Sequence, residues 1–149
     1  MRALVIGAGA VGTKVSQQLL SSNVVDKIIL RDTSPEKLGI ASKTLGRHVE
    51  VEHFPFSQNM DADVVVVASP RGTQLEAVKK AISLRRPTVV VSDDLAETVS
   101  ILNLEKEAFE FGVPVVVGTG FAPGMSCVLT AYGKTLLEEI EEIHISKMG

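Results

Sequence analysis

Five short runs of the sequence are almost continuously apolar and rich in β-branched residues. They cover residues 3–6, 27–30, 64–67, 88–91 and 113–117. Strands of a parallel sheet have this composition, because helices cover such a sheet on both faces. A sixth run, residues 48–54, alternates instead, with Val49 and Val51 on one side. This alternation predicts a strand nearer the edge of the sheet.

Between these runs, apolar residues recur at helical spacing. The stripes are Val11, Val15, Leu19 and Leu20; then Leu75, Val78 and Ile82; then Leu95, Val99, Leu102 and Ala108, within a long segment of about 94–111. Near the end, Leu136, Leu137, Ile140 and Ile143 continue a helical stripe. Ser34 before Pro35 predicts a capped helix start, and Gly112 predicts a helix end.

The alternation of strand and helix predicts an α/β fold, a single domain built on a doubly wound parallel sheet with right-handed crossovers. The expected order is β-α-β-α-β-β-α-β-α-β-α, closing with a strand near residues 143–146. Residues 55–63 leave too little room for a full helix between the third and fourth strands.

Composition narrows the class of protein. A length of 149 residues with 45% apolar content suits one domain with a sizeable core. The longest apolar runs, such as residues 64–68, fall far short of the ~20 residues of a membrane span, and no secretory signal follows Met1. A net charge of −3 argues against a nucleic-acid partner. We therefore expect a cytoplasmic domain with no membrane or nucleic-acid partner.

The turn after the first strand fits the pattern G-x-G-x-x-G, formed by Gly7, Gly9 and Gly12 with Ala10 and Val11 between the last two. Gly7 permits a tight turn, Gly9 lets a diphosphate approach the backbone, and Gly12 lets the helix pack against the strand. Free N–H groups at the helix start then face the diphosphate. This context predicts a dinucleotide site of the Rossmann fold; the alternative is a turn that only packs.

The second strand ends at Asp32, twenty residues after Gly12. An acidic residue at this place accepts hydrogen bonds from the adenosine ribose hydroxyls and repels a 2′-phosphate, which favours NAD over NADP. Arg31 and Lys37 complicate this preference, since a nearby cation accommodates a phosphate. Asp32 could also form an Asx turn into Ser34, and the two roles are compatible if one carboxylate oxygen serves the turn.

Ligands of doubly wound sheets bind outside the carboxyl ends of the strands. Ser69 and Pro70 follow the fourth strand, where they would pass the nicotinamide side of a dinucleotide. Gly120 and Phe121 belong to the loop 119–126 after the sixth strand, whose glycines and proline fix a specific backbone path.

Other polar residues near these strand ends have ordinary explanations. Ser92 or Asp93 is expected to cap the following helix, and Arg71 is either a solvated loop charge or an anion contact. Cys127 is expected to be a core or semi-buried thiol, and the alternative is a reactive thiol activated by a helix N-terminus. No spacing of His48, His53 and His144 predicts a metal site.

With these residues in view, the chain resembles the N-terminal NAD(P)-binding half of the saccharopine dehydrogenase and L-lysine dehydrogenase family. The resemblance rests on the glycine turn, on residues 31–38 and 63–70, and above all on the segment Gly120 to Ser126. It implies a nicotinamide cofactor and hydride transfer from an amine carbon of an amino-acid substrate. It also implies a substrate domain absent from this chain, with residues of about 141–149 as its first strand, so the chain alone is expected to be inactive.

Two departures from that family leave the catalytic acid and base unassigned. Relatives often carry an Asp where this chain has Gly118-Thr119, and Val-Asp where it has Val91-Ser92.

The alternative to a dehydrogenase domain is a stand-alone nucleotide-sensing domain of a transport system, which shares the size, the glycine turn and the acidic residue after the second strand. Apolar surface left by a missing domain would favour self-association, for example as a homodimer.

Overall fold

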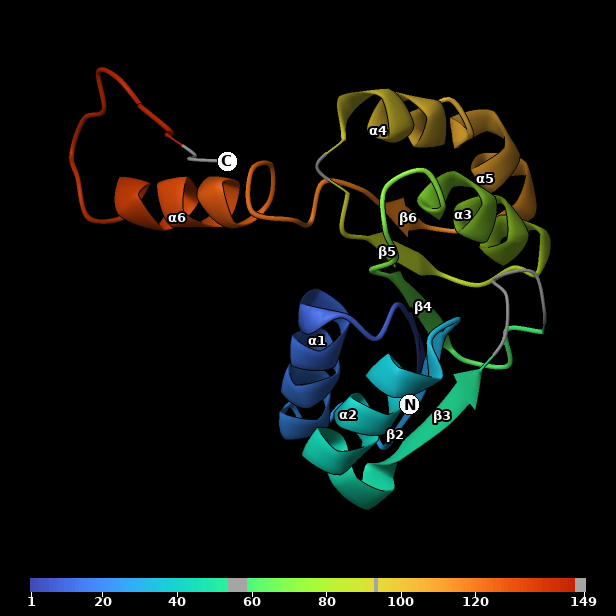
Figure 1. Cartoon of the computed structure of the whole chain (residues 1–149). Coiled ribbons are helices and arrows are strands. Elements are labelled where there is room, and N and C mark those ends of the chain that lie inside the picture. Colours follow the sequence, from blue (N-terminus) through green and yellow to red (C-terminus); the bar gives the residue numbers. More distant parts are fainter. Residues whose placement is uncertain (54–58, 93, 147–149) are drawn as a thin grey trace.

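The computed structural model describes residues 1–53, 59–92 and 94–146. Its centre is a six-stranded parallel sheet with the order β3-β2-β1-β4-β5-β6, drawn in Figure 1. The strands are β1 (Arg2–Ile6), β2 (Lys27–Asp32), β3 (Val49–His53), β4 (Val64–Val67), β5 (Thr88–Val90) and β6 (Val115–Val116). This order reverses between β1 and β4, so the predicted doubly wound sheet is confirmed. The alternating strand β3 lies at one edge, also as predicted.

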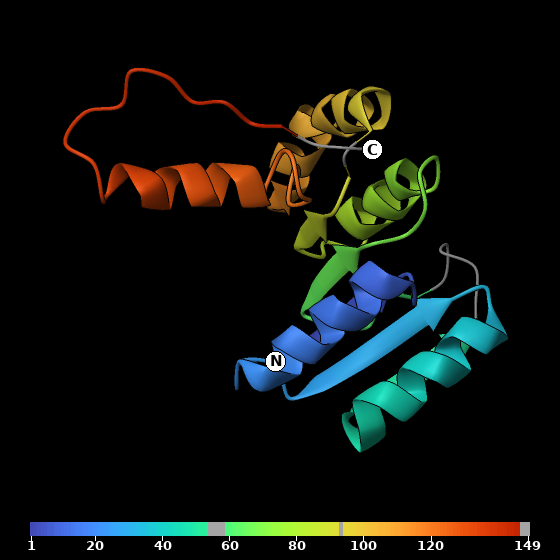
Figure 2. The ribbon, with the colours of Figure 1, turned by 60° about the vertical axis from the view of Figure 1, so that its left-hand side comes forward.

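The helices are α1 (Ala10–Ser21), α2 (Pro35–Leu45), α3 (Gln74–Ser83), α4 (Leu95–Leu102), α5 (Glu105–Phe111) and α6 (Met125–Lys134), with a short 3-10 turn, η1 (Gly46–His48). The first five cover the two faces of the sheet, and α6 does not (Figure 1). The core is divided by the sheet into two clusters. One contains Val5 and Leu30 with residues of α2, and the other contains Leu4 and Val67 with residues of α3 and α4. Helices α1 and α2 therefore cover one face, and α3 to α5 the other (Figure 2).

The predicted stripe of the segment 94–111 is wrong at Leu95, Val99 and Leu102, whereas Ala108 packs against the core as predicted. The segment forms two helices that break at Asn103 and Leu104, and α4 turns Ile101 and Glu97 toward the protein. Leu95 is 79% exposed, and Val99 and Leu102 are also exposed. The prediction missed the buried face because one of its two inward residues is a glutamate.

The stripe of α1 is confirmed at Val15, Leu19 and Leu20, which pack against the core. Gly12 and Ser16 are its buried residues, whereas Val11 is exposed. Small residues face the sheet here because α1 begins directly on the tight turn and lies close to the strands. The stripe of α3 is confirmed, with Val78 and Ile82 fully buried.

The prediction for the C-terminal segment is wrong. Helix α6 ends at Lys134, so Leu136 to Ile143 continue no helical stripe, and residues 143–146 form no strand. Helix α6 stands away from the sheet, and the segment after it runs back along the helix (Figures 1 and 2). An extended segment at this distance from the sheet has no neighbouring strand to pair with.

Two further expectations concern the third crossover and membrane-spanning helices. The described residues 59–63 of the third crossover contain no helix, as expected, while residues 54–58 lie outside the described residues. Within the described part of the chain, no helix has the length and apolar character needed to cross a membrane.

Candidate functional site

The glycine turn has the close contacts that its sequence predicts. Gly7 has a φ of 108°, and a Cβ added there would lie 2.4 Å from the carbonyl oxygen of Ala68. A Cβ on Gly12 would lie 1.8 Å from the carbonyl oxygen of Gly7. Both positions therefore require glycine: Gly7 for the turn and its contact with β4, and Gly12 for the packing of α1.

The start of α1 is open in front of this turn. Gly9 is the N-cap of the helix, and a Cβ added to it would meet no heavy atom within 4 Å. Ala10 and Val11 form the first turn, where backbone N–H groups have no acceptor within the helix. Both side chains are exposed. The geometry leaves room for an anionic group against the helix start.

Asp32 lies beside the glycine turn and is 7% exposed. Its Oδ2 accepts a hydrogen bond from the N–H of Ala8 (2.7 Å), and its Oδ1 accepts one from the N–H of Ser34 (2.8 Å). The second bond is the predicted Asx turn. One oxygen serves this turn, as expected, and the other is engaged by the glycine turn. Each carboxylate oxygen keeps a further lone-pair direction and can accept a second donor.

Arg31 is not available to a phosphate. Its guanidinium is buried and donates to Glu52 Oε2 at 2.6 and 3.0 Å and to the carbonyl oxygen of Asn59 at 2.7 Å. Successive side chains of a strand point to opposite faces, so Arg31 and Asp32 face different ways. Of the two cations considered beside the ribose, Lys37 lines the cavity beside the glycine turn, and the side chain of Arg31 does not.

Two cavities flank the glycine turn. The larger has a volume of about 440 Å³ and is lined by Ala8, Gly9, Ala10, Thr13, Lys14, Lys37 and Ile40. The smaller has about 170 Å³ and is lined by Val11, Ala68, Ser69, Arg71, Gln74, Val91, Ser92 and Asp94. The first lies between α1 and α2, near the end of β2, and the second lies at the carboxyl ends of β4 and β5.

The predicted residues after β4 have different surroundings. Ser69 is buried with its Oγ 2.9 Å from Thr73 Oγ1, and it lines the smaller cavity. Pro70 is exposed and lines neither of the two cavities. Arg71 is exposed, lies 3.2 Å from Asp94 Oδ2 and also lines the smaller cavity, so both of its expected roles stay predictions.

The cap of α4 is Asp94, one or two residues after the expected caps. Its Oδ1 accepts from the N–H of Glu97 at 2.9 Å, and the N–H of Asp94 lies 3.3 Å from Ser92 Oγ. Ser92 thus supports the turn before the cap, and Asp93 lies outside the described residues. Capping, rather than catalysis, accounts for these contacts.

The loop after β6 follows one defined path. The carbonyl oxygen of Gly120 accepts from the N–H of Met125, and that of Phe121 accepts from the N–H of Ser126, both at 2.9 Å. Gly124 has a φ of 125°, and a Cβ there would lie 2.2 Å from the carbonyl oxygen of Gly120. These contacts agree with the fixed path predicted from the glycines and proline.

The same loop is attached to the end of β5. Thr119 Oγ1 donates to the carbonyl oxygen of Val90 at 2.8 Å, and a Cβ on Gly120 would lie 3.8 Å from the carbonyl oxygen of Ser92. Gly120 therefore lies at the same edge as the smaller cavity. Phe121 is exposed and lines neither cavity beside the glycine turn.

Glu97 is a buried residue of the site that the sequence did not reveal. Its carboxylate accepts from the N–H groups of Gly72 (2.9 Å), Gln74 (2.8 Å) and Leu75 (3.1 Å). An acid on α4 thus caps the start of α3, beside the smaller cavity. These partners lie 22 to 25 residues away along the chain, and no local spacing indicates such a contact.

The remaining candidates lie apart from this edge. Cys127 is exposed, contrary to the expectation of a semi-buried thiol, because α6 stands away from the core. The described residues contain no group of three His, Cys, Asp or Glu side chains able to hold a metal ion.

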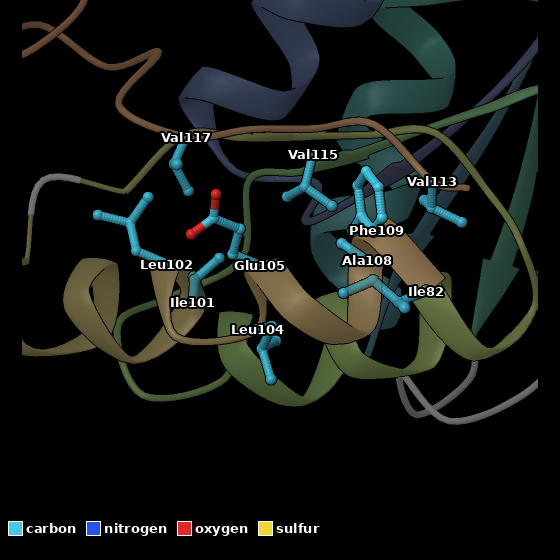
Figure 3. A pocket seen from close by; sticks show the side chains of 10 residues that line it. All are labelled: Ile82, Ile101, Leu102, Leu104, Glu105, Ala108, Phe109, Val113, Val115 and Val117. Atoms are coloured by element: carbon cyan, nitrogen blue, oxygen red, sulfur yellow. The ribbon is translucent and has the colours of Figure 1, made fainter. Parts of the chain in front are cut away.

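A third cavity, of about 600 Å³, lies away from the glycine turn (Figure 3). Side chains of α4 and α5 form one wall, and Val113, Val115 and Val117 form the other. Glu105 is the charged residue among its lining residues.

Comparison with known proteins identifies the family. A family model described as NADP oxidoreductase, coenzyme F420-dependent, matches residues 3–93, which is more than half of the chain. The chain belongs to this family. The matched segment includes the glycine turn, Asp32, Ser69 and Pro70. The chain is therefore an NAD(P)-binding oxidoreductase domain, a broader assignment than the resemblance to saccharopine and lysine dehydrogenases.

Solved dehydrogenase structures share the fold. GenD2 from gentamicin A biosynthesis, solved with NAD, is 21% identical with a TM-score of 0.67 over 79% of this chain and 34% of that one. Saccharopine dehydrogenase (L-Glu forming) from Saccharomyces cerevisiae is 19% identical with a TM-score of 0.70, over 89% and 31%. The WlbA dehydrogenase from Chromobacterium violaceum, solved with NADH and UDP-GlcNAcA, is 14% identical with a TM-score of 0.68, over 91% and 40%.

These similarities establish the fold alone, because the identities are low. The chain spans about a third of the first two proteins and two-fifths of the third. The three proteins carry different names and bound molecules, so the likeness selects no substrate.

Proposed function

We propose that this chain is the NAD-binding domain of a dehydrogenase that transfers hydride from an amine carbon of an amino acid to nicotinamide. One observation carries the cofactor part. The Asp32 carboxylate lies one hydrogen bond from Ala8, within the glycine turn that would hold the diphosphate. A ribose hydroxyl at Asp32 and a diphosphate at the start of α1 are the two contacts that an adenosine diphosphate makes in this fold.

The residues present fit the dinucleotide. Gly9 leaves open space in front of the first turn of α1, where Ala10 and Val11 offer backbone N–H groups. Cavities lie on both sides of the turn, so an extended ligand would have room for one half on each side. When bound, the nicotinamide would accept the hydride, and the protein residues would orient it.

The charges beside Asp32 support NAD over NADP. A buried carboxylate repels a 2′-phosphate, and Arg31, which could have offset it, is engaged with Glu52. Lys14 and Lys37 line the larger cavity and are the cations that would favour NADPH. The family description names NADP, so titration with both cofactors decides this preference.

The substrate class rests on the resemblance to saccharopine and lysine dehydrogenases, carried mainly by Gly120 to Ser126. Saccharopine dehydrogenase is also among the solved structures with this fold. We propose that a second domain completes the substrate pocket and that this chain alone binds cofactor without turnover. Appearance of NADH from NAD with amino-acid amines, and not with sugars or alcohols, in a protein that includes this domain is the corresponding test.

Calorimetric titration of the chain with NADH and NADPH tests the cofactor assignment. We expect NADH to bind more tightly, and Asp32→Ala to weaken NADH more than NADPH. Because that variant also removes two backbone hydrogen bonds, the ratio of the two dissociation constants is the informative quantity. Damage to the turn would weaken both ligands alike, whereas loss of the ribose contact changes the ratio. Tighter binding of NADPH by the unmodified chain would refute the preference for NAD.

A further inference from the structure

Gln74 is a buried polar residue whose amide oxygen has no hydrogen-bond partner within the described residues. It is the first residue of α3 and is 4% exposed. Its Nε2 donates to the carbonyl oxygen of Ser69 at 2.8 Å. Its Oε1 is buried and has no hydrogen-bond partner within the described chain. Buried polar atoms of native proteins almost always have a partner, either in the protein or in ordered water. A water or a ligand group in the cavity that Gln74 lines could supply this partner.

The side-chain amide and the backbone of Gln74 are each held by a hydrogen bond. The bond to Ser69 fixes the amide group, and the backbone N–H of Gln74 donates to Glu97 Oε1 at 2.8 Å. The buried carboxylate of Glu97 thus anchors the residue, and rotation of the amide would break the bond to Ser69. An acceptor fixed in this way is suited to position a ligand group.

Gln74 lines the smaller cavity at the carboxyl ends of β4 and β5. If the adenosine half of a dinucleotide lies toward Asp32, its other half must cross the glycine turn toward this cavity, because the fold binds one mononucleotide on each half of the sheet. The nicotinamide ring carries a carboxamide, whose NH₂ group is a hydrogen-bond donor. A donor of this kind matches the unpaired Oε1.

We propose that Gln74 Oε1 accepts a hydrogen bond from the carboxamide NH₂ of the bound nicotinamide and so fixes the orientation of the ring. Gln74 is then a binding and positioning residue, beyond the glycine turn and Asp32. The proposal rests on the proposed function, since it needs a nicotinamide dinucleotide in this orientation.

The test pairs a variant of the residue with a variant of the ligand. Gln74→Met removes the amide and keeps the length of the side chain, and Gln18→Met, on the exposed side of α1, is the matched control. The ligands are NADH, reduced acetylpyridine adenine dinucleotide, which has a methyl ketone in place of the carboxamide, and ADP-ribose, which lacks the ring. Calorimetry measures each dissociation constant.

We expect the unmodified chain to bind NADH about five- to tenfold more tightly than the acetylpyridine analogue, as the loss of one hydrogen bond predicts. Gln74→Met should weaken NADH by the same factor and leave the analogue and ADP-ribose unchanged. Gln18→Met should change none of the three. The comparison of NADH with the acetylpyridine analogue uses the unmodified chain, so it does not depend on whether a variant folds.

Equal binding of NADH and the analogue by the unmodified chain would overturn the proposal, as would a Gln74→Met variant that weakens both by the same factor. In both cases binding of NADH and ADP-ribose would leave the proposed function standing. A folded chain that binds neither NADH nor ADP-ribose would overturn the proposed function and this inference together.

Discussion

The substitution Gly12→Ala tests whether the start of α1 is held against the glycine turn as tightly as the structure indicates. The added Cβ would lie 1.8 Å from the carbonyl oxygen of Gly7, whereas real Cβ atoms essentially never approach a heavy atom within 3.0 Å. The backbone must therefore move by more than an ångström. Overpacking of this kind costs about 3 kcal/mol at the upper end, and the helix preference of alanine offsets up to about 1 kcal/mol.

The expected net loss is about 2 kcal/mol of unfolding free energy, or a fall in Tm of about 4–8 °C for a domain of this size. Gly39→Ala is the matched control, because Gly39 lies within α2 and its added Cβ meets nothing within 4 Å. We expect this control to gain about 0.5–1 kcal/mol. Urea denaturation measures both. A Gly12→Ala variant as stable as Gly39→Ala would refute the close packing of the turn.

Three further predictions concern other parts of the chain. Glu97→Gln replaces a buried carboxylate that accepts three backbone N–H groups, and urea denaturation should show a loss of about 2–3 kcal/mol, against less than about 0.5 kcal/mol for the exposed Glu110→Gln. The hydrogen bond from Lys27 lowers the pKa of Glu50, so this carboxylate stabilises the folded state above its ordinary pKa and loses that effect on acidification. The difference in Tm between the unmodified chain and Glu50→Gln should accordingly be present at neutral pH and vanish at strongly acidic pH; a difference that grows on acidification would contradict this sign. The exposed Cys127 should react with a thiol reagent in the native state as fast as in urea, and strong protection would mean that α6 is covered in solution.

Much of the fold follows from local sequence. Strands β1 and β4 are recognisable because their residues are apolar on both faces, which is a property of each run by itself. The start of α2 is equally local, since Ser34 accepts from the N–H of Lys37 and Pro35 takes the first helical position. The glycine turn was predicted for the same reason, because steric demands at Gly7 and Gly12 arise within a few residues.

The errors concern features that depend on distant residues. The apolar stripe through Leu95 and Val99 is a regular helical pattern, but α4 is oriented by Glu97, whose partners lie at the start of α3. The pattern after α6 predicts a helix and a strand, and neither forms within the described residues, because the segment has α6 beside it and no strand of the sheet to pair with.

In the candidate site, too, some features follow from local sequence and others depend on the fold. Asp32 was predicted from its distance to the glycine turn, but the use of both its oxygens by the backbone depends on the fold. The engagement of Arg31 by Glu52 requires β2 and β3 to be paired, and Gln74 becomes a candidate only when its buried Oε1 and the cavity beside it are known. The sequence therefore locates the diphosphate side of the site better than the nicotinamide side.

A crystal structure of this chain with NADH tests the central claim most directly. We predict the diphosphate against the backbone N–H groups at the start of α1, the adenosine ribose hydroxyls within hydrogen-bond distance of Asp32, and the nicotinamide at the ends of β4 and β5. A dinucleotide bound away from the glycine turn, or with its nicotinamide half at Asp32, would contradict the account.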